Sequence, residues 1–430
     1  MHANRLIHTC FWGFMGALAA APLAAAFEAP KEIPSGEVVS ESVLSDPLYR
    51  IAPSVRADGF AQQYTIKTTG FGNLHASSDY MLPERIREVQ ALAVLEDLHR
   101  HEAFGSALQE AAKKPFLVGR DLVTKPKQTL SSAGEGLKKA TNKAVGWLSG
   151  DRRERADSED SAFSEAIGFS RTKRKLAAQL GVDVYSTNAK LQDEMDQVCW
   201  ATVTGGISVS AMMAALALPP IVDIARHTTS FTGGLNNLLV TQSGGDLYRM
   251  NREILNGMGF PPSQTEPFLD NEHASPRHKT FIVAAMKDLE GVEGLDILIA
   301  HGRALRSEDD ALRLQRTVEL ARGHHRHVAP LRRIVDVGGE IVLVTTRGQV
   351  VATLPADRLL WTAYTEQLAK SLEKQRDAEP EVDEKHLWIT GVFSDEARNQ
   401  LRDRDIVLHD QASDTLEPPS QQARYSATWE

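Results

Sequence analysis

The chain has 430 residues, 42% of them hydrophobic and 24% charged, and its formal net charge is −9. This composition is typical of a soluble globular protein with room for two or three domains, and it does not fit a disordered or fibrous chain. With only two cysteines, Cys10 and Cys199, the protein is not a small disulfide-stapled scaffold, and ordinary hydrophobic cores must stabilise it.

Residues 1–26 have the pattern of a secretory signal peptide. A positively charged start is followed by an apolar run at 11–21 and by three alanines at 24–26, the small residues that signal peptidase requires. The apolar run is shorter than the ~20 residues that a membrane-spanning helix needs. We therefore expect cleavage before Phe27 and export to the periplasm or cell envelope of a bacterium, which leaves Cys199 as the only cysteine.

The next part of the chain predicts a helical body. Residues 27–60 are rich in Pro, Ser and Glu and indicate an extended N-terminal segment. Residues 61–330 predict a mostly helical body that opens with a strand at 62–69. Capping residues, first-turn prolines and terminal glycines mark the ends of its helices, which we expect near 83–112, 162–180, 247–255, 277–289 and 308–327.

A basic segment at 113–155 interrupts this body. It carries eleven Lys and Arg against four Asp and Glu, a net charge of +7, so the rest of the chain carries −16. This asymmetry favours an anionic partner, either a membrane surface or an acidic face of an envelope protein, and we expect no nucleic acid partner.

Within that segment, residues 129–149 predict an amphipathic helix with a thin apolar stripe, lysines on the opposite face and an indole at the boundary. This pattern is typical of a helix that lies in a membrane interface, and an ordinary surface helix packed on the core is the alternative. The residues expected to contact lipid or an anionic partner are Lys125, Lys127, Lys138, Lys139, Lys143 and Trp147.

Residues 198–222 contain no charged side chain and are long enough to span a bilayer. Their serines, threonines, glycines and prolines make them less apolar than a typical span. We therefore predict a helical hairpin buried inside the body, with membrane insertion and a partner-binding face as alternatives. Cys199 lies on this stretch without a neighbouring cation in the sequence, which favours a buried, inert thiol.

After about residue 331 the hydrophobic pattern changes to short β-branched runs. We predict a small α/β module at 331–410, followed by a disordered polar tail at 411–430. The module should contain strands near 334–337, 341–345 and 350–354, a helix at 355–374, and a strand–helix–strand unit at 386–409. The fold class is therefore α+β, a predominantly helical body with a small C-terminal α/β module.

The sequence contains no strong catalytic motif. His324, His325 and His327 are too close together for all three to surround one ion, and they favour a role at a helix C-terminus. Ser394 follows a strand and opens a helix, which indicates a helix cap or a weak anion site. No metal or cofactor is predicted, and the oligomeric state stays open.

The function that these patterns favour is non-enzymatic: an envelope protein that contacts a membrane surface or another envelope protein. Two alternatives stay open. One is a hydrolase-like periplasmic enzyme with a site assembled from dispersed residues, and the other is a purely soluble partner-binding protein.

Overall fold

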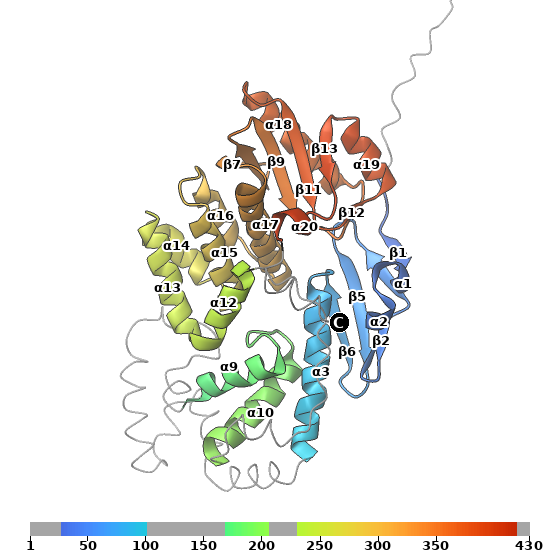
Figure 1. The fold of residues 1–430 in the computed structure, drawn as a ribbon, viewed down its shortest axis with the longest axis vertical. Coiled ribbons are helices and arrows are strands. Elements are labelled where there is room, and N and C mark those ends of the chain that lie inside the picture. The colour runs from blue at the N-terminus through green and yellow to red at the C-terminus, as the bar shows by residue number, and fades with distance from the viewer. Residues whose placement is uncertain (1–26, 101–167, 206–229, 419–430) are drawn as a thin grey trace, which may run out of the picture.

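The computed structural model describes residues 27–100, 168–205 and 230–418, and these form a mixed α+β fold (Figure 1). The predicted signal peptide at 1–26 and the basic segment at 113–155 lie outside the described residues. The same holds for all six predicted contact residues, Lys125, Lys127, Lys138, Lys139, Lys143 and Trp147.

An antiparallel sheet begins the described chain. Its strands are β1 (Lys31–Pro34), β2 (Ser45–Asp46), β3 (Tyr49–Ile51), β4 (Ser54–Ala57), β5 (Gln62–Thr68) and β6 (Asn73–Ser77). β5 is central: β4 and β3 pair with its two ends on one edge, and β6 pairs with the other edge. The stretch 27–60, predicted as an extended N-terminal segment, is therefore built into this sheet, with two short helices, α1 (Ser35–Val38) and α2 (Glu41–Leu44), between its strands.

Three helices follow this sheet. α3 (Met81–Arg100) packs on β5 and β6, α10 (Ala189–Gly205) packs on α3, and α9 (Phe169–Leu180) packs on α10. α9 ends as predicted at Gly181, which adopts the left-handed conformation that glycine tolerates best. Cys199 is 0% exposed, so the predicted burial of this thiol is confirmed. The second half of the predicted apolar hairpin lies beyond Gly205 and outside the described residues.

The middle of the chain is helical. Its elements are α12 (Ser230–Thr241), α13 (Gly244–Gly257), α14 (Pro262–Leu269), α15 (Pro276–Asp288), α16 (Leu295–Arg303) and α17 (Glu308–His327). Ser243, Ser275 and Ser307 cap three of these helices by accepting backbone hydrogen bonds. α17 runs through the centre of the molecule, between the other helices of this group and the C-terminal sheet (Figure 1).

A second, mixed sheet follows. Its strands are β7 (Leu331–Val337), β8 (Glu340–Thr345), β9 (Gln349–Leu354), β11 (Glu384–Ile389) and β13 (Ile406–His409), in the order β13-β11-β9-β8-β7. β7, β8 and β9 are antiparallel, whereas β9, β11 and β13 are parallel.

Helices cover both faces of this sheet, which explains why every residue of β9 after Gln349 is buried. Val351 packs in the core that includes α17, and its neighbours Val350 and Ala352 pack in the core that includes α18 (Ala363–Ala378). α19 (Asp395–Arg402) and α20 (Ser413–Leu416) complete the described chain, and a short parallel pair, β10 (Arg358–Leu359) and β12 (Val392–Phe393), lies at one end of the sheet.

Two predictions at the C-terminal end are wrong. The helix expected at 355–374 begins only at Ala363, because the preceding backbone pairs with the turn after β4: the Asp357 and Leu360 amides donate to the Phe60 and Gly59 carbonyls. The tail expected to be disordered from residue 411 is folded up to residue 418, because the α20 residue Leu416 is 1% exposed in the core beside α17.

Candidate functional site

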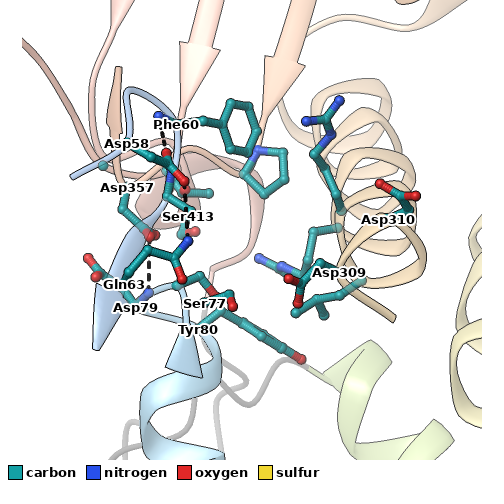
Figure 2. A pocket seen from close by; sticks show the side chains of 18 of the residues that line it. Asp58, Phe60, Gln63, Ser77, Asp79, Tyr80, Asp309, Asp310, Asp357 and Ser413 are labelled. Carbon is teal, nitrogen blue, oxygen red and sulfur yellow. Dashed lines mark hydrogen bonds between the residues drawn. The ribbon is translucent and has the colours of Figure 1, made fainter. Parts of the chain in front are cut away.

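A cavity of about 550 Å³ lies where the first sheet, α17 and the C-terminal sheet meet (Figure 2). The turn after β4 and the junction of β6 with α3 form one wall, and the N-terminal half of α17 forms the facing wall. Segments around Asp357, Gly391 and Ser413 close the cavity from the C-terminal side.

The turn after β4 is fixed by Asp58 and Gly59. The Asp58 carboxylate accepts hydrogen bonds from the amides of Phe60 and Ala61, each at 2.9 Å. Gly59 has φ +107°, and a Cβ there would lie 2.9 Å from the Thr362 Cγ2 atom. Only glycine therefore lets the turn approach the segment before α18 so closely.

Asp357 is the most unusual group in the cavity. It is 5% exposed, and its Oδ2 accepts hydrogen bonds from the amides of Gln62 at 2.9 Å and Asp79 at 3.1 Å. Within the described chain, no group donates to its Oδ1 and no Lys or Arg forms an ion pair with it. Burial, and then the negative charge of Asp79, raise the Asp357 pKa well above its usual value.

Asp79 forms a pair with Asp357 at the surface of the cavity. Its Oδ1 accepts a hydrogen bond of 2.5 Å from the Tyr64 hydroxyl, and Tyr64 is itself buried. Asp79 is exposed as a residue, but the atoms packed around its carboxyl raise its pKa by desolvation, while the Tyr64 bond and the Arg358 charge act in the opposite direction. Burial and then Asp79 raise the Tyr64 pKa, so Tyr64 stays protonated and donates.

The facing wall belongs to α17, where residues four or seven apart share one helix face. Asp309, Arg313 and Arg316 all line the cavity from this face. Arg316 is buried and already compensated, because its guanidinium donates to Glu319 and, at 2.7 and 2.5 Å, to Glu417. It also lies over the Tyr80 ring, 4.6 Å from the centroid.

Arg313 differs from Arg316 because it is exposed and no carboxylate in the described residues lies within ion-pair distance of it. Its guanidinium lies over the rings of Phe60 and Tyr364, at 5.0 and 5.7 Å from their centroids. The two rings meet edge to face and hold the arginine at the rim. A smaller cavity of about 190 Å³ lies on the other side of Arg313, next to Glu340.

Acidic side chains outnumber basic ones in the main cavity. Six aspartates line it, Asp58, Asp79, Asp309, Asp310, Asp357 and Asp414, against Arg313 and Arg316. Since Arg316 is neutralised by two glutamates, the cavity favours positive charge. No three His, Cys, Asp or Glu residues in the described ranges are placed to hold a metal ion.

The histidines and Ser394 singled out in the sequence lie elsewhere. His324 is buried near the end of α17, edge-on to Trp388, and burial lowers its pKa to about 4. The Nδ1 of His325 accepts a hydrogen bond from the Leu331 amide. Ser394 caps α19 and donates to the carboxylate of Glu28, so an N-terminal residue occupies this helix end.

The chain matches no protein-family model, no curated protein and no solved structure. Among the helices that the structure describes, none combines the length and the apolar character needed to cross a bilayer.

Proposed function

We propose that the protein binds a small polar solute with a positively charged nitrogen in the cavity between the first sheet, α17 and the C-terminal sheet. The observation that supports this most directly is Asp357, a buried carboxyl in the cavity wall with one oxygen that no described residue satisfies. This oxygen is not fully enclosed, so a donor on a ligand in the cavity can bind it in place of water.

The charge and size of the cavity support the same solute class. The excess of aspartates attracts cations and concentrates them at the cavity mouth. A volume of about 550 Å³ falls in the range of pockets that enclose small molecules.

The raised pKa of Asp357 gives the binding a pH dependence. An ammonium group and a proton compete for the same carboxyl, so binding of the solute releases a proton. Affinity should therefore rise with pH until the Asp79–Asp357 pair is ionised in the free protein, and binding should be weakest in acid.

Calorimetric titration of the full chain with spermidine and glucosamine tests this proposal. We expect Asp357→Asn to weaken binding at least tenfold, because the amide keeps the two backbone contacts but loses the charge. Asp296→Asn, at an exposed position of α16, is the matched control and should bind like the parent. Equal affinity of the parent and Asp357→Asn would reject the proposal.

A hydrolase-like activity is the second candidate, and the Asp79–Asp357 pair favours it. Two neighbouring carboxyls with raised pKa can share one proton, so that one acts as general acid and the other as general base. Hydrolysis of peptide or glycoside substrates should then be lost in Asp79→Asn and in Asp357→Asn alike. Activity retained in both variants would contradict it.

The location of the protein is also a proposal, and it is supported only by the sequence. We propose export through residues 1–26 and contact of the segment 113–155 with an anionic membrane or an envelope protein. Vesicle flotation should show reduced binding after Lys138→Glu, Lys139→Glu and Lys143→Glu together. The control changes three exposed lysines elsewhere, Lys31, Lys190 and Lys287, to glutamate. An equal loss of vesicle binding in both triple variants would argue against a role for the segment.

The division into a predominantly helical body at 61–330 and a small α/β module at 331–410 is proposed on the same footing. The C-terminal sheet supports this division, because all five of its strands come from residues after 330. Limited proteolysis should cut first within residues 373–385 or after residue 413, and early cleavage inside 341–354 would contradict the division.

A further inference from the structure

Arg313 is a positive charge that forms no ion pair with any described residue, although it lies near enough to Glu340 for its charge to lower the pKa of that carboxyl. It is exposed at the cavity, and none of the described carboxylates comes within ion-pair distance. Its guanidinium carbon lies 5.0 and 5.7 Å from the ring centroids of Phe60 and Tyr364. A planar guanidinium is the usual recognition group for a carboxylate.

The nearest acidic wall does not supply that carboxylate. Asp310 lines the cavity one turn before Arg313, but its carboxylate accepts a hydrogen bond from the Arg306 amide at 3.2 Å. Asp309, four residues before Arg313 on the same helix face, forms no ion pair with it. Glu340 accepts a hydrogen bond from the Tyr364 hydroxyl and forms no ion pair with Arg313, so among the described residues none occupies the guanidinium and it can bind an anionic group from outside the chain.

The negative end of the cavity lies on a different wall. Figure 2 shows Asp357 and Asp79 on one side of the cavity and the α17 helix, with Asp309 and Asp310, on the other. The unsatisfied oxygen of Asp357 and the guanidinium of Arg313 thus belong to opposite walls of one cavity. One wall therefore carries the Asp79 and Asp357 carboxyls, and the facing wall carries Arg313 beside Asp309 and Asp310.

Two simpler ligand classes fit this arrangement poorly. A compact anion that binds Arg313 would meet the excess of aspartates, and a polyamine would place positive charge against Arg313. A ligand that carries an ammonium group at one end and a carboxylate at the other satisfies both ends.

We propose that the ligand is a zwitterion, an amino acid or short peptide, with its ammonium group against Asp357 and Asp79 and its carboxylate against Arg313. This inference rests on the proposed function and adds the class of ligand. The free volume of about 550 Å³ accommodates a ligand of dipeptide size.

The test is calorimetric titration of the full chain with a set of dipeptides that includes Lys-Ala and Phe-Ala, each as the free peptide, the C-terminal amide and the N-acetyl form. The parent protein should bind the free peptide at least tenfold more tightly than either blocked form. Arg313→Gln should bind the free peptide with at least tenfold lower affinity than the parent, and its affinity for the amide should change little.

Two further variants separate recognition from folding. Arg313→Lys keeps the charge but not the fork of donors, so it should bind with intermediate affinity. Arg303→Gln removes an exposed arginine at the end of α16 and should bind like the parent. Circular dichroism melts of all variants identify any that fail to fold.

The outcomes distinguish this inference from the proposed function. If the amide and spermidine bind as tightly as the free peptide, or if Arg313→Gln binds the peptide like the parent, the zwitterion is rejected while binding of a cationic solute stands. If an N-acetyl peptide binds as tightly as the free peptide, the ammonium contact is rejected. If neither peptides nor amines bind, both proposals are wrong.

Discussion

Arg316 and Glu417 form a two-fold hydrogen-bonded ion pair, at 2.7 and 2.5 Å, across 101 residues of sequence. Both side chains are buried, and Arg316 also donates to Glu319. The pair fixes α20 against α17. Because Ser413 and Asp414 line the cavity, the same ion pair holds the C-terminal wall of the candidate site in place.

Arg316→Met should destabilise the protein by about 3–5 kcal/mol, because it leaves two buried carboxylates without their cation. Urea denaturation followed by circular dichroism measures the loss. The triple variant Arg316→Met, Glu319→Gln, Glu417→Gln should recover much of it, since no buried charge remains. Arg249→Met, which removes an exposed ion pair on α13, should cost about 1 kcal/mol or less, and a similar cost for Arg316→Met would contradict the prediction.

Gly323→Ala should displace α20 from α17. A Cβ at this position would lie 2.2 Å from the Leu416 carbonyl oxygen, so the helix or the segment after it has to move. We expect a loss of about 1–3 kcal/mol and faster amide exchange in residues 411–417. The control is Gly234→Ala in α12, where a Cβ meets no atom within 4 Å and should add about 0.5–1 kcal/mol of stability. Unchanged exchange after Gly323→Ala would refute the close contact.

Where local signals agree, the sequence predicts the fold well. The bounds of α17 follow from the Ser307 cap, the acidic first turn and the basic last turn, and strands β7 to β9 follow from their β-branched runs. The strands before β5 escaped prediction because they are two to four residues long, too short to show a period. Their pairing with β5, rather than their own pattern, makes them strands.

The candidate site could not be predicted in the same way. Asp79 and Asp357 are 278 residues apart, and Arg313 lies on a third element, so no spacing in the sequence connects them. Pro355 suggests the start of a helix, whereas the backbone around Asp357 is held by the turn at Gly59. The predicted basic segment at 113–155 lies outside the described residues.

Asp357→Asn should raise stability at neutral pH. Because the folded pKa of Asp357 is raised, the carboxyl stabilises the fold only while it is protonated, below its unfolded pKa near 4, and this contribution is lost as pH rises through the folded value. The variant and the parent should therefore have similar stability at pH 3, with the variant gaining as pH rises. Thermal melts at several pH values measure the difference. Asp296→Asn should show no such growing gap, and a variant less stable at pH 7 would contradict the prediction.

Cys199 should resist thiol reagents in the native protein and react after unfolding. Its side chain is 0% exposed on α10, in the core with Leu191 and Met195. A Cys10→Ser background isolates its signal, and the rate of reaction with an aromatic disulfide reagent is compared with and without denaturant. A fast native reaction would show that α10 is open to solvent.

The last prediction concerns acid stability. Burial, and then the charge of His386, lower the pKa of both His324 and His409 to about 4. The fold therefore favours the neutral imidazoles, whereas the unfolded chain takes up protons below pH 6.5. The contribution of these two histidines to stability should be constant above pH 6.5. It should fall between about pH 6.5 and 4 and level off below pH 4.

His409→Phe separates this effect from the carboxyls that titrate in the same range. Phenylalanine can keep the stack on Trp388, where the ring centroids are 3.6 Å apart, but it binds no proton. Urea denaturation from pH 7 to 4 should then show a smaller loss of stability for the variant than for the parent. His273→Gln, at an exposed position, should follow the parent, and an equal loss in His409→Phe would mean that the imidazole at 409 does not contribute.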